Sequence, residues 1–562
     1  MNTNPLATGR GRKNTVLLSF LLVLILALSA CGAANKTSGT GSKYGGVLTV
    51  VPGPYGNFTD NFAVYAPGGN VGTLGMIYET LLYFNRETGQ VSPWLASSYQ
   101  LASDAKSITF TIRQGVKWSD GQPFTAQDVV FTLNYMKQYP AIDTNALWQT
   151  ISSVTSPDAN TVQVSFKQAS SSMLWYLGGQ TYIVPQHIWQ SVSDPATNAN
   201  AKPIGTGPFT LKSFSPQLYV LGRNTNYWQP GKPYINEIHY PALNSNTSAD
   251  LVLSQGSLDW AGLFTPNIQQ TFVNRDPAHN KYWFPPSGLT VLYLNLTKAP
   301  FNDLAVRQAI SLAVDRQQMS QKGEDGYQQV ANPTGLLMPN FQSYLDPSYA
   351  NATFSVDTAK AMSTLQSAGY TKGSDGIFAK NGQKLSFNMN VVSGWTDWVT
   401  DVQIMASNLK AIGMNVNVNA ISYNSYYNAL QNGTFDTSIS WTANGPTPYF
   451  TYYGMMSSAE SAAVGKAAAQ NWERWNNSQT DTLLSQYAST ADQNAQKQAI
   501  QSLEKYVVDQ VPVVPLIYGS TWYEYSTARF TGWPDQNNTY AVPAPWSYPD
   551  DGVVAQNLHP VS

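Results

Sequence analysis

Cysteine and histidine are scarce in this chain of 562 residues, which contains one cysteine and four histidines. A single thiol cannot form an internal disulfide bond. The histidines lie far apart in the sequence, and no Gly-x-Ser-x-Gly or His-Glu-x-x-His motif occurs. We therefore expect neither an enzyme nor a bound metal or cofactor. A secreted hydrolase remains an alternative, because a glycosidase needs only two suitably spaced carboxylates.

Charged residues are also few. They make up 11% of the chain, against roughly 25% in ordinary soluble domains. The formal net charge is -2, and no concentrated basic segment is present. Binding to nucleic acid calls for a basic face, so we do not expect a nucleic-acid partner.

The N-terminal segment has the pattern of an export signal. Arg10, Arg12 and Lys13 precede an apolar run over 16–30, which is too short to span about 30 Å of hydrocarbon comfortably. Leu28-Ser29-Ala30-Cys31 closes this run and resembles the lipobox of bacterial lipoproteins. The resemblance predicts a signal peptide over 1–30, a lipidated Cys31, and a flexible tether to residue 43. It also implies an extracytoplasmic protein anchored to the cell membrane by lipid.

The rest of the chain alternates between strand and helix patterns, which predicts a mixed α/β fold. Residues 46–51 read as a buried strand, and 107–113 alternate polar and apolar residues with the period of a half-buried strand. Helices are expected from about Ala126 behind Thr125, behind Asn302, and over 358–368 behind Asp357. A chain of this length exceeds a single hydrophobic core.

Several motifs together resemble one known family. They are Tyr78-Glu79-Thr80-Leu81-Leu82, Pro93-Trp94-Leu95-Ala96, the segment from Gly115 to Val129 (GVKWSDGQPFTAQDV), and Gly205-Thr206-Gly207-Pro208-Phe209. In this order and spacing they are similar to the large extracellular solute-binding proteins of ABC importers, family 5. The resemblance implies a type II periplasmic-binding-protein-like α/β fold with two hinged lobes and an extra subdomain. It also implies a permease and its ATPase as partners, and we expect a monomer.

The predicted organisation follows from that resemblance. Lobe I is expected over 44–75, 186–288 and 525–562, and its extra subdomain over 76–185. Lobe II is expected over 289–524. Ligand would be enclosed between the lobes.

The residues after a predicted strand at 437–440 bear on the choice of ligand. In peptide-binding members of the family, a Trp-x-x-Asp arrangement in this loop receives the peptide's amino terminus. Here Trp441 is followed by Asn444 in place of the acid. An amide offers no charge to balance an enclosed ammonium group, and such burial is costly. A free peptide amine is therefore disfavoured.

Aromatic residues cluster around this loop, with few charges between them. Flat rings beside amide and hydroxyl groups suit sugars, which favours a neutral oligosaccharide. The segment Gly445-Pro446-Thr447-Pro448-Tyr449 also resembles the corresponding loop of cello- and manno-oligosaccharide binders in the family, and this resemblance implies a cello- or manno-type ligand. An oligopeptide is the alternative on the same scaffold, and an adhesin or sensor using the same cleft is another. The predicted ligand-binding residues are Trp441, Asn444, Trp395, Trp398, Tyr423, Tyr449 and Tyr453, with Tyr55, Phe58 and Asn61 from the loop after the first strand.

Overall fold

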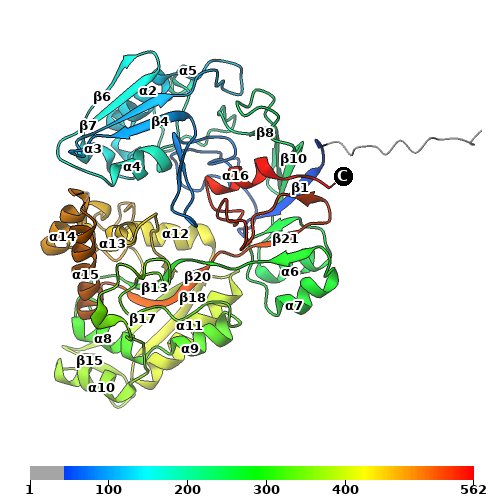
Figure 1. Cartoon of the computed structure of the whole chain (residues 1–562). Coiled ribbons are helices and arrows are strands. Elements are labelled where there is room, and N and C mark those ends of the chain that lie inside the picture. Colours follow the sequence, from blue (N-terminus) through cyan, green and yellow to red (C-terminus); the bar gives the residue numbers. More distant parts are fainter. Residues whose placement is uncertain (1–42, 491, 562) are drawn as a thin grey trace, which may run out of the picture. The chain divides into compact units, whose positions relative to one another are not determined.

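The protein was analysed as a computed structural model, which describes residues 43–490 and 492–561. The predicted lipidation site Cys31, the export signal and all but the last residue of the tether lie outside the described residues. The structure contains three large sheets with helices packed around them, as the α/β prediction requires (Figure 1). Within the described ranges, no helix has the length and apolar character needed to cross a bilayer.

The first sheet has seven strands in the order β12-β21-β11-β1-β10-β9-β8. Its central strand β1 runs parallel to β10 and β11, and the remaining neighbours pair antiparallel. The predicted strand over 46–51 is confirmed as β1. The strand bounds are β1 Val47–Val51, β8 Phe209–Ser215, β9 Leu218–Arg223, β10 Glu237–Pro241, β11 Trp260–Ala261, β12 Asn280–Tyr282 and β21 Glu524–Ser526.

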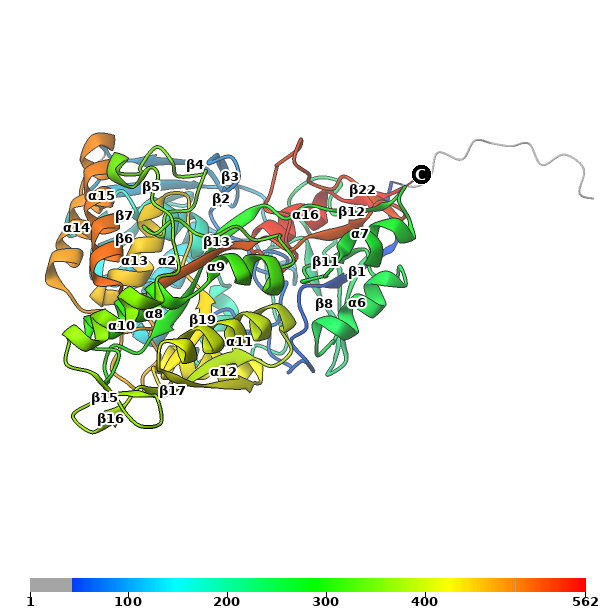
Figure 2. The same ribbon diagram turned by 90° about the horizontal axis from the view of Figure 1, so that it is seen from below.

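The second sheet has five strands in the order β18-β17-β19-β13-β20. Strand β17 runs parallel to both β18 and β19, whereas β13 pairs antiparallel with β19 and β20. Helices α8 to α12 lie close to this sheet (Figure 2). The bounds are β13 Pro286–Leu294, β17 Ser386–Val392, β18 Asn415–Ile421, β19 Thr437–Trp441, β20 Val514–Ser520, α8 Leu304–Ala313, α9 Arg316–Gln318, α10 Thr358–Ser367, α11 Thr396–Ala411 and α12 Tyr423–Asn432.

The third sheet is antiparallel, in the order β4-β5-β7-β6, and helix α2 packs on it. The half-buried strand predicted from alternation is β5, whose Ile108, Phe110 and Ile112 are buried. Helix α2 begins behind Thr125 with the expected capping box, because Asp128 accepts a hydrogen bond from the Thr125 backbone at 2.9 Å. The bounds are β4 Ala96–Leu101, β5 Ser107–Ile112, β6 Ile151–Asp158, β7 Thr161–Phe166 and α2 Ala126–Gln138.

Smaller elements connect and cover the three sheets. The additional strands are β2 Leu82–Phe84, β3 Val91–Pro93, β14 Thr371–Lys372, β15 Phe378–Lys380, β16 Gln383–Lys384, β22 Phe530–Thr531 and β23 His559–Pro560. The additional α-helices are α3 Leu147–Thr150, α4 Met173–Trp175, α5 Gln186–Trp189, α6 Asn246–Ser254, α7 Ile268–Thr271, α13 Pro448–Met456, α14 Ser478–Ala488, α15 Gln493–Gln510 and α16 Asp550–Asn557.

Two helix starts test the capping predictions. The side chain of Asp357 accepts a hydrogen bond from the Lys360 backbone at 2.8 Å, which confirms it as the cap of α10. The cap of α8 is Asp303, whose side chain accepts from Ala305, so the prediction of Asn302 was wrong by one residue. Two adjacent residues that both favour the cap position cannot be ranked from sequence alone.

Glycines in the motif over 205–209 allow two segments to approach closely. A side-chain carbon on Gly205 would lie 1.8 Å from the carbonyl oxygen of Ile77, and one on Gly207 would lie 2.3 Å from that of Met76. The Gly207 backbone donates to the Ile77 carbonyl at 2.9 Å. The motif therefore joins the chain before β8 to the segment that leads into the third sheet.

The first and second sheets are joined by two short segments that lie side by side. One connects β12 to β13, the other connects β20 to β21, and they exchange hydrogen bonds between Trp283 and Tyr523 and between Thr521 and Pro285. Such paired crossings let two bodies rotate with little loss of contact. The residue bounds predicted for the lobes and the subdomain stay a prediction.

Several carboxyl groups are enclosed by these elements. Burial raises the pKa of Glu79, Asp250 and Glu504 to about 7 and that of Glu460 to about 8. Glu504 on α15 is fully buried, and one of its oxygens accepts from the Asp346 backbone at 2.9 Å while the other has no hydrogen-bond partner. Folding therefore favours the protonated form of these groups.

This predicts a stability that falls as pH rises. A carboxyl whose pKa is higher in the folded than in the unfolded state stabilises the fold below about pH 4, and this contribution disappears as pH rises to about 7. Glu504→Gln should reduce the loss of unfolding free energy between pH 5 and pH 8 by about 2 kcal/mol, measured by urea unfolding. The exposed Asp60→Asn is the control. An unchanged slope in Glu504→Gln would contradict the assignment.

Candidate functional site

Aromatic rings converge where strands β17, β18 and β19 end. The ring of Trp441 lies 6.1 Å from that of Trp395, 6.0 Å from that of Trp398 and 6.4 Å from that of Tyr427, measured between centroids. Trp395 also lies 5.8 Å from Tyr423. Trp398 is 8% exposed, whereas the other four rings are only partly buried. The cluster therefore presents ring surface that the protein does not cover.

The sheet explains why these residues meet. Because β17 runs parallel to β18 and β19, all three strands end at the same edge of the second sheet. Trp395 caps the helix that follows β17, Tyr423 begins the helix that follows β18, and Trp441 is the last residue of β19. The carboxyl edge of parallel strands is the usual position of ligands in α/β sheets.

A residue from the first sheet meets this cluster. Tyr55, in the loop after β1, lies 5.3 Å from Tyr423 between ring centroids. Both rings are partly exposed, and burial raises the pKa of both phenols. Tyr55 and Tyr423 thus bring together the loops that follow strands of two different sheets.

Asn444 is exposed, and both ends of its amide are hydrogen bonded. Its oxygen accepts from the Arg86 guanidinium at 3.0 Å, and its nitrogen donates to the Ser287 carbonyl at 3.1 Å. Arg86 lies between β2 and β3, far from Asn444 in the sequence. A cation therefore lies beside the amide of Asn444.

Arg86 is itself held by the C-terminal segment. It donates to the hydroxyl of Ser547 and forms an ion pair with Asp550 at 3.1 Å. Asp550 is fully buried and also accepts from the hydroxyl of Tyr83 at 2.7 Å. The guanidinium is thus fixed on one side by a buried carboxylate, and its other side faces Asn444.

Tyr548 lies close to this contact. The residue is 49% exposed, yet burial raises the pKa of its phenol, an effect that Arg86 partly offsets. Its phenol also raises the pKa of Tyr55, Tyr423 and Tyr427, so it lies near all three.

Tyr449 and Tyr453 lie in a different cluster. Tyr449 is 3% exposed and stacks on Tyr487 at 4.6 Å, and it also lies 5.3 Å from Tyr453. Tyr453 is 6.3 Å from Tyr176, which follows α4. Among the residues that the structure describes, no ring contact joins these two tyrosines to Trp441 or Trp395. They connect helix α13 to the region of the third sheet.

Phe58 and Asn61 organise their own loop. Phe58 packs edge-on against Tyr219 of β9 at 4.7 Å. The Asn61 side chain donates to the Pro67 carbonyl and accepts from the Ala63 backbone, both at 3.0 Å. Neither residue contacts the ring cluster around Trp441 in the described part of the chain.

The sequence analysis missed Arg86, Ser547, Tyr548 and Asp550. Arg86 belongs to a short hairpin connection, and no local pattern links it to a loop about 350 residues away. Tyr427 could have been found, because it lies one helical turn after Tyr423 on α12, and the two rings stack at 5.9 Å.

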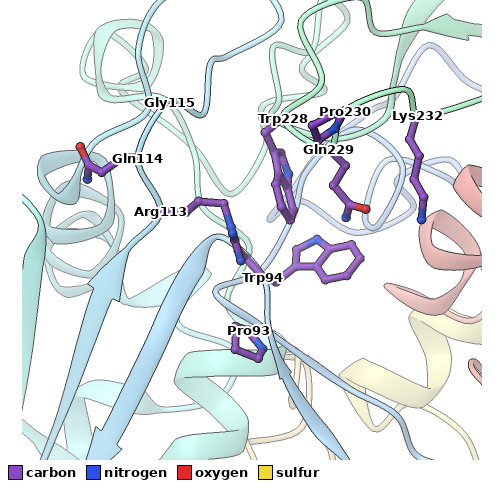
Figure 3. A pocket seen from close by; sticks show the side chains of 9 residues that line it. All are labelled: Pro93, Trp94, Arg113, Gln114, Gly115, Trp228, Gln229, Pro230 and Lys232. Carbon is purple, nitrogen blue, oxygen red and sulfur yellow. The ribbon is translucent and has the colours of Figure 1, made fainter.

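A recess lies elsewhere in the described chain. It measures about 490 Å³ and is lined by residues that include Trp94, Arg113 and Trp228 (Figure 3). None of the predicted ligand-binding residues lines it. Within residues 43–490 and 492–561, no three His, Cys, Asp or Glu side chains gather in a way that could hold a metal ion.

Known structures share this fold. A mannohexaose-bound periplasmic oligopeptide-binding protein of an ABC transporter from Thermotoga maritima superposes with a TM-score of 0.86 and 25% identity, covering 92% of this chain and 98% of that one. AppA from Bacillus subtilis in complex with a nonapeptide superposes with a TM-score of 0.76. The prediction of a two-lobed periplasmic-binding-protein fold is thereby confirmed.

Relatives are also found by sequence. The nickel-binding periplasmic protein of Escherichia coli (strain K12) is 29% identical over 75% of this chain and 79% of that protein. The oligopeptide-binding protein AppA of Bacillus subtilis (strain 168) is 25% identical over 91% of this chain and 94% of that protein.

A family model matches the middle of the chain. The model for the bacterial extracellular solute-binding proteins, family 5, matches residues 90–463. With the motifs, the fold and the relatives in agreement, the chain belongs to the family 5 extracellular solute-binding proteins, which capture solutes for ABC importers.

Proposed function

We propose that this protein captures a neutral oligosaccharide of the cello or manno type between its two lobes and delivers it to an ABC permease. In this proposal the protein acts as a monomer, held at the cell membrane by lipid on Cys31. The permease and its ATPase supply the energy for import. The observation that carries the proposal is the pair formed by Asn444 and Arg86.

The charges at this pair disfavour a peptide amino terminus. An ammonium group enclosed near Asn444 would find an uncharged amide and, beyond it, the guanidinium of Arg86 at 3.0 Å from the amide oxygen. Two cations that approach in a partly desolvated site repel each other, and an unpaired buried charge is costly. A ligand without a leading positive charge avoids both costs.

The ring cluster favours a sugar. Trp395, Tyr427 and Trp441 retain free ring surface, and Tyr548 adds a half-exposed phenol. Aromatic faces bury apolar area while their polar ends remain able to hydrogen bond, which matches the apolar faces and hydroxyl edges of sugar rings. The likeness to the mannohexaose-bound protein from Thermotoga maritima supports the same choice.

An oligopeptide is the second candidate. Relatives include oligopeptide-binding and di/tripeptide-binding proteins. Glu87, next to Arg86, has a carboxylate without a hydrogen-bond partner in the described chain, and burial raises its pKa to about 7. The Glu87 carboxylate can balance the charge of an ammonium group, whereas the Asn444 amide cannot.

Capture requires that ligand favours the closed arrangement over the open one. Tyr55 lies in the loop after β1 of the first sheet, and Tyr423 begins the helix after β18 of the second sheet. Their rings come into contact only when these two segments are close. A ligand that fills the space beside these rings would stabilise their approach, and the permease would then recognise the closed form.

Calorimetry tests the ligand class. We expect at least one series among cello-, manno- and xylo-oligosaccharides to bind with micromolar affinity or better, and di- to pentapeptides to give no heat of binding. The physical reason is the missing counter-charge at Asn444. Tight peptide binding without any response to sugars would reverse the proposal.

Trp441→Ala tests the site. Removal of a ring that stacks on ligand should weaken binding of the best oligosaccharide by about 10-fold or more, since buried aromatic anchors carry much of the energy of an interface. Tyr282→Ala removes a 40% exposed ring from the first sheet and serves as the control. If Trp441→Ala folds and its affinity stays within two-fold of that of the wild type, the assignment of Trp441 to the ligand site is wrong.

A double variant tests the charge argument. Asn444→Asp alone should not create peptide binding, because the new carboxylate would pair with Arg86. Asn444→Asp combined with Arg86→Gln should bind a tripeptide at least 10-fold more tightly than the single variant does, and N-acetylation of the tripeptide should abolish the gain. Asn424→Asp, an exposed site on α12, is the charge-matched control. Equal peptide affinity of the single and double variants would refute the role of Arg86.

A further inference from the structure

The recess shown in Figure 3 lies between the third-sheet region and the loop after β9. Its volume of about 490 Å³ falls within the range of small-molecule sites. The side chains of Trp94, Arg113, Gln114, Trp228, Gln229 and Lys232 line it. None of them contacts the ring cluster around Trp441, so this recess is separate from the proposed oligosaccharide site.

Two indole rings form a fixed corner in the recess. The rings of Trp94 and Trp228 are perpendicular, with centroids 5.5 Å apart. Both indole nitrogens donate to the carboxylate of Glu79, at 2.7 Å from Trp94 and 3.1 Å from Trp228. Glu79 is 2% exposed, so it holds the rings from behind and shows no charge to the recess. Both rings remain partly exposed.

Arg113 supplies an unsatisfied cation at this corner. Its guanidinium carbon lies 4.5 Å from the centroid of the Trp228 ring, and its Nε donates to the Trp94 carbonyl at 2.7 Å. Its two terminal nitrogens have no hydrogen-bond partner among the described residues, and no carboxylate pairs with it there. Figure 3 shows the guanidinium directed toward the space between the two indoles. The planar pair of terminal N–H groups matches a carboxylate.

Lys232 adds a second positive group. Its Nζ donates to the Asn557 side chain at 2.5 Å, and burial lowers its pKa. Gln114 and Gln229 each donate their amide nitrogen within the protein, to the Ile112 carbonyl and the Tyr227 hydroxyl, and their oxygens have no donor in the described chain. No Asp or Glu is among the residues that line the recess. The site is therefore cationic, with flat apolar walls, and the Gln229 oxygen is an amide acceptor beside them without a donor in the described chain.

We propose that this recess binds a small aromatic carboxylate. The carboxylate would pair with the terminal nitrogens of Arg113, and the ring would lie in the corner between Trp94 and Trp228. The amide oxygen of Gln229 suits a hydroxyl group on the ring, whereas the Gln114 side chain points away from the corner (Figure 3). The arrangement combines a charge-assisted, two-pronged contact with aromatic packing, each of which favours binding on its own.

Calorimetry with 4-hydroxybenzoate as the probe tests this proposal. The wild-type protein should bind it with millimolar or tighter affinity, and should bind the uncharged 4-hydroxybenzamide at least 10-fold more weakly. Arg113→Lys keeps the positive charge but loses the paired N–H groups of the guanidinium. It should weaken the binding of 4-hydroxybenzoate by at least 10-fold. Arg275→Gln changes an exposed arginine elsewhere and should have no effect. Equal binding of acid and amide, or no binding of the acid, would overturn the proposal.

A measurement on the wild-type protein guards against a folding defect in the variant. Phenylglyoxal modifies accessible arginines, and mass spectrometry reports each site. We expect 4-hydroxybenzoate to protect Arg113 at least five-fold while Arg275 reacts unchanged. Glucuronate is the comparison for a sugar acid. Protection by glucuronate but not by 4-hydroxybenzoate, or protection of neither arginine, would contradict an aromatic ligand.

Discussion

The parallel register of β17 with β18 and β19 is the constraint on which the proposed oligosaccharide site depends. It makes three strands end at one edge, so the loops that follow them deliver Trp395, Tyr423 and Trp441 to the same place. Hydrogen bonds of the ladder thus fix the spacing of the rings, while the loops need only provide the right residues. A site built on sheet ends is held more rigidly than one built on loops alone.

Arg86 places a positive charge at this edge of the second sheet. Its ion pair with the buried Asp550 fixes the guanidinium, and it also donates to Asn444 in the loop after β19 of the second sheet. One arginine therefore connects the hairpin after β2, the C-terminal segment and the loop after β19. In the proposed function, the same residue would link the choice of ligand to the approach of the bodies that carry these segments, because both would depend on what bonds to Asn444.

Much of the fold could be predicted, because local chemistry determines it. The cap at Thr125 and Asp128, the alternation of β5 and the cap at Asp357 all depend on neighbours within a few residues. The meeting of the aromatic rings was predictable only in part, because the strand before Trp441 was recognised at 437–440, whereas the strands before Trp395 and Tyr423 were not. The partners of Asn444 were not predictable, because Arg86 and Ser287 come from distant segments whose meeting is decided by tertiary packing. Tyr449 shows the converse, as an aromatic residue near the loop that packs on Tyr487 instead.

The amide of Asn444 has a consequence for unloading. Both of its ends already have protein partners, so a solute that engages Asn444 must first displace Arg86 or the Ser287 carbonyl. Ligand binding at Asn444 then replaces one hydrogen bond with another. The net gain in binding free energy is therefore smaller than a new hydrogen bond alone would provide. In the proposed function, the amide and the guanidinium can re-form their bond as the solute leaves, while the loops that carry them are still close. The protein would thus compete with its own cargo, which favours prompt release.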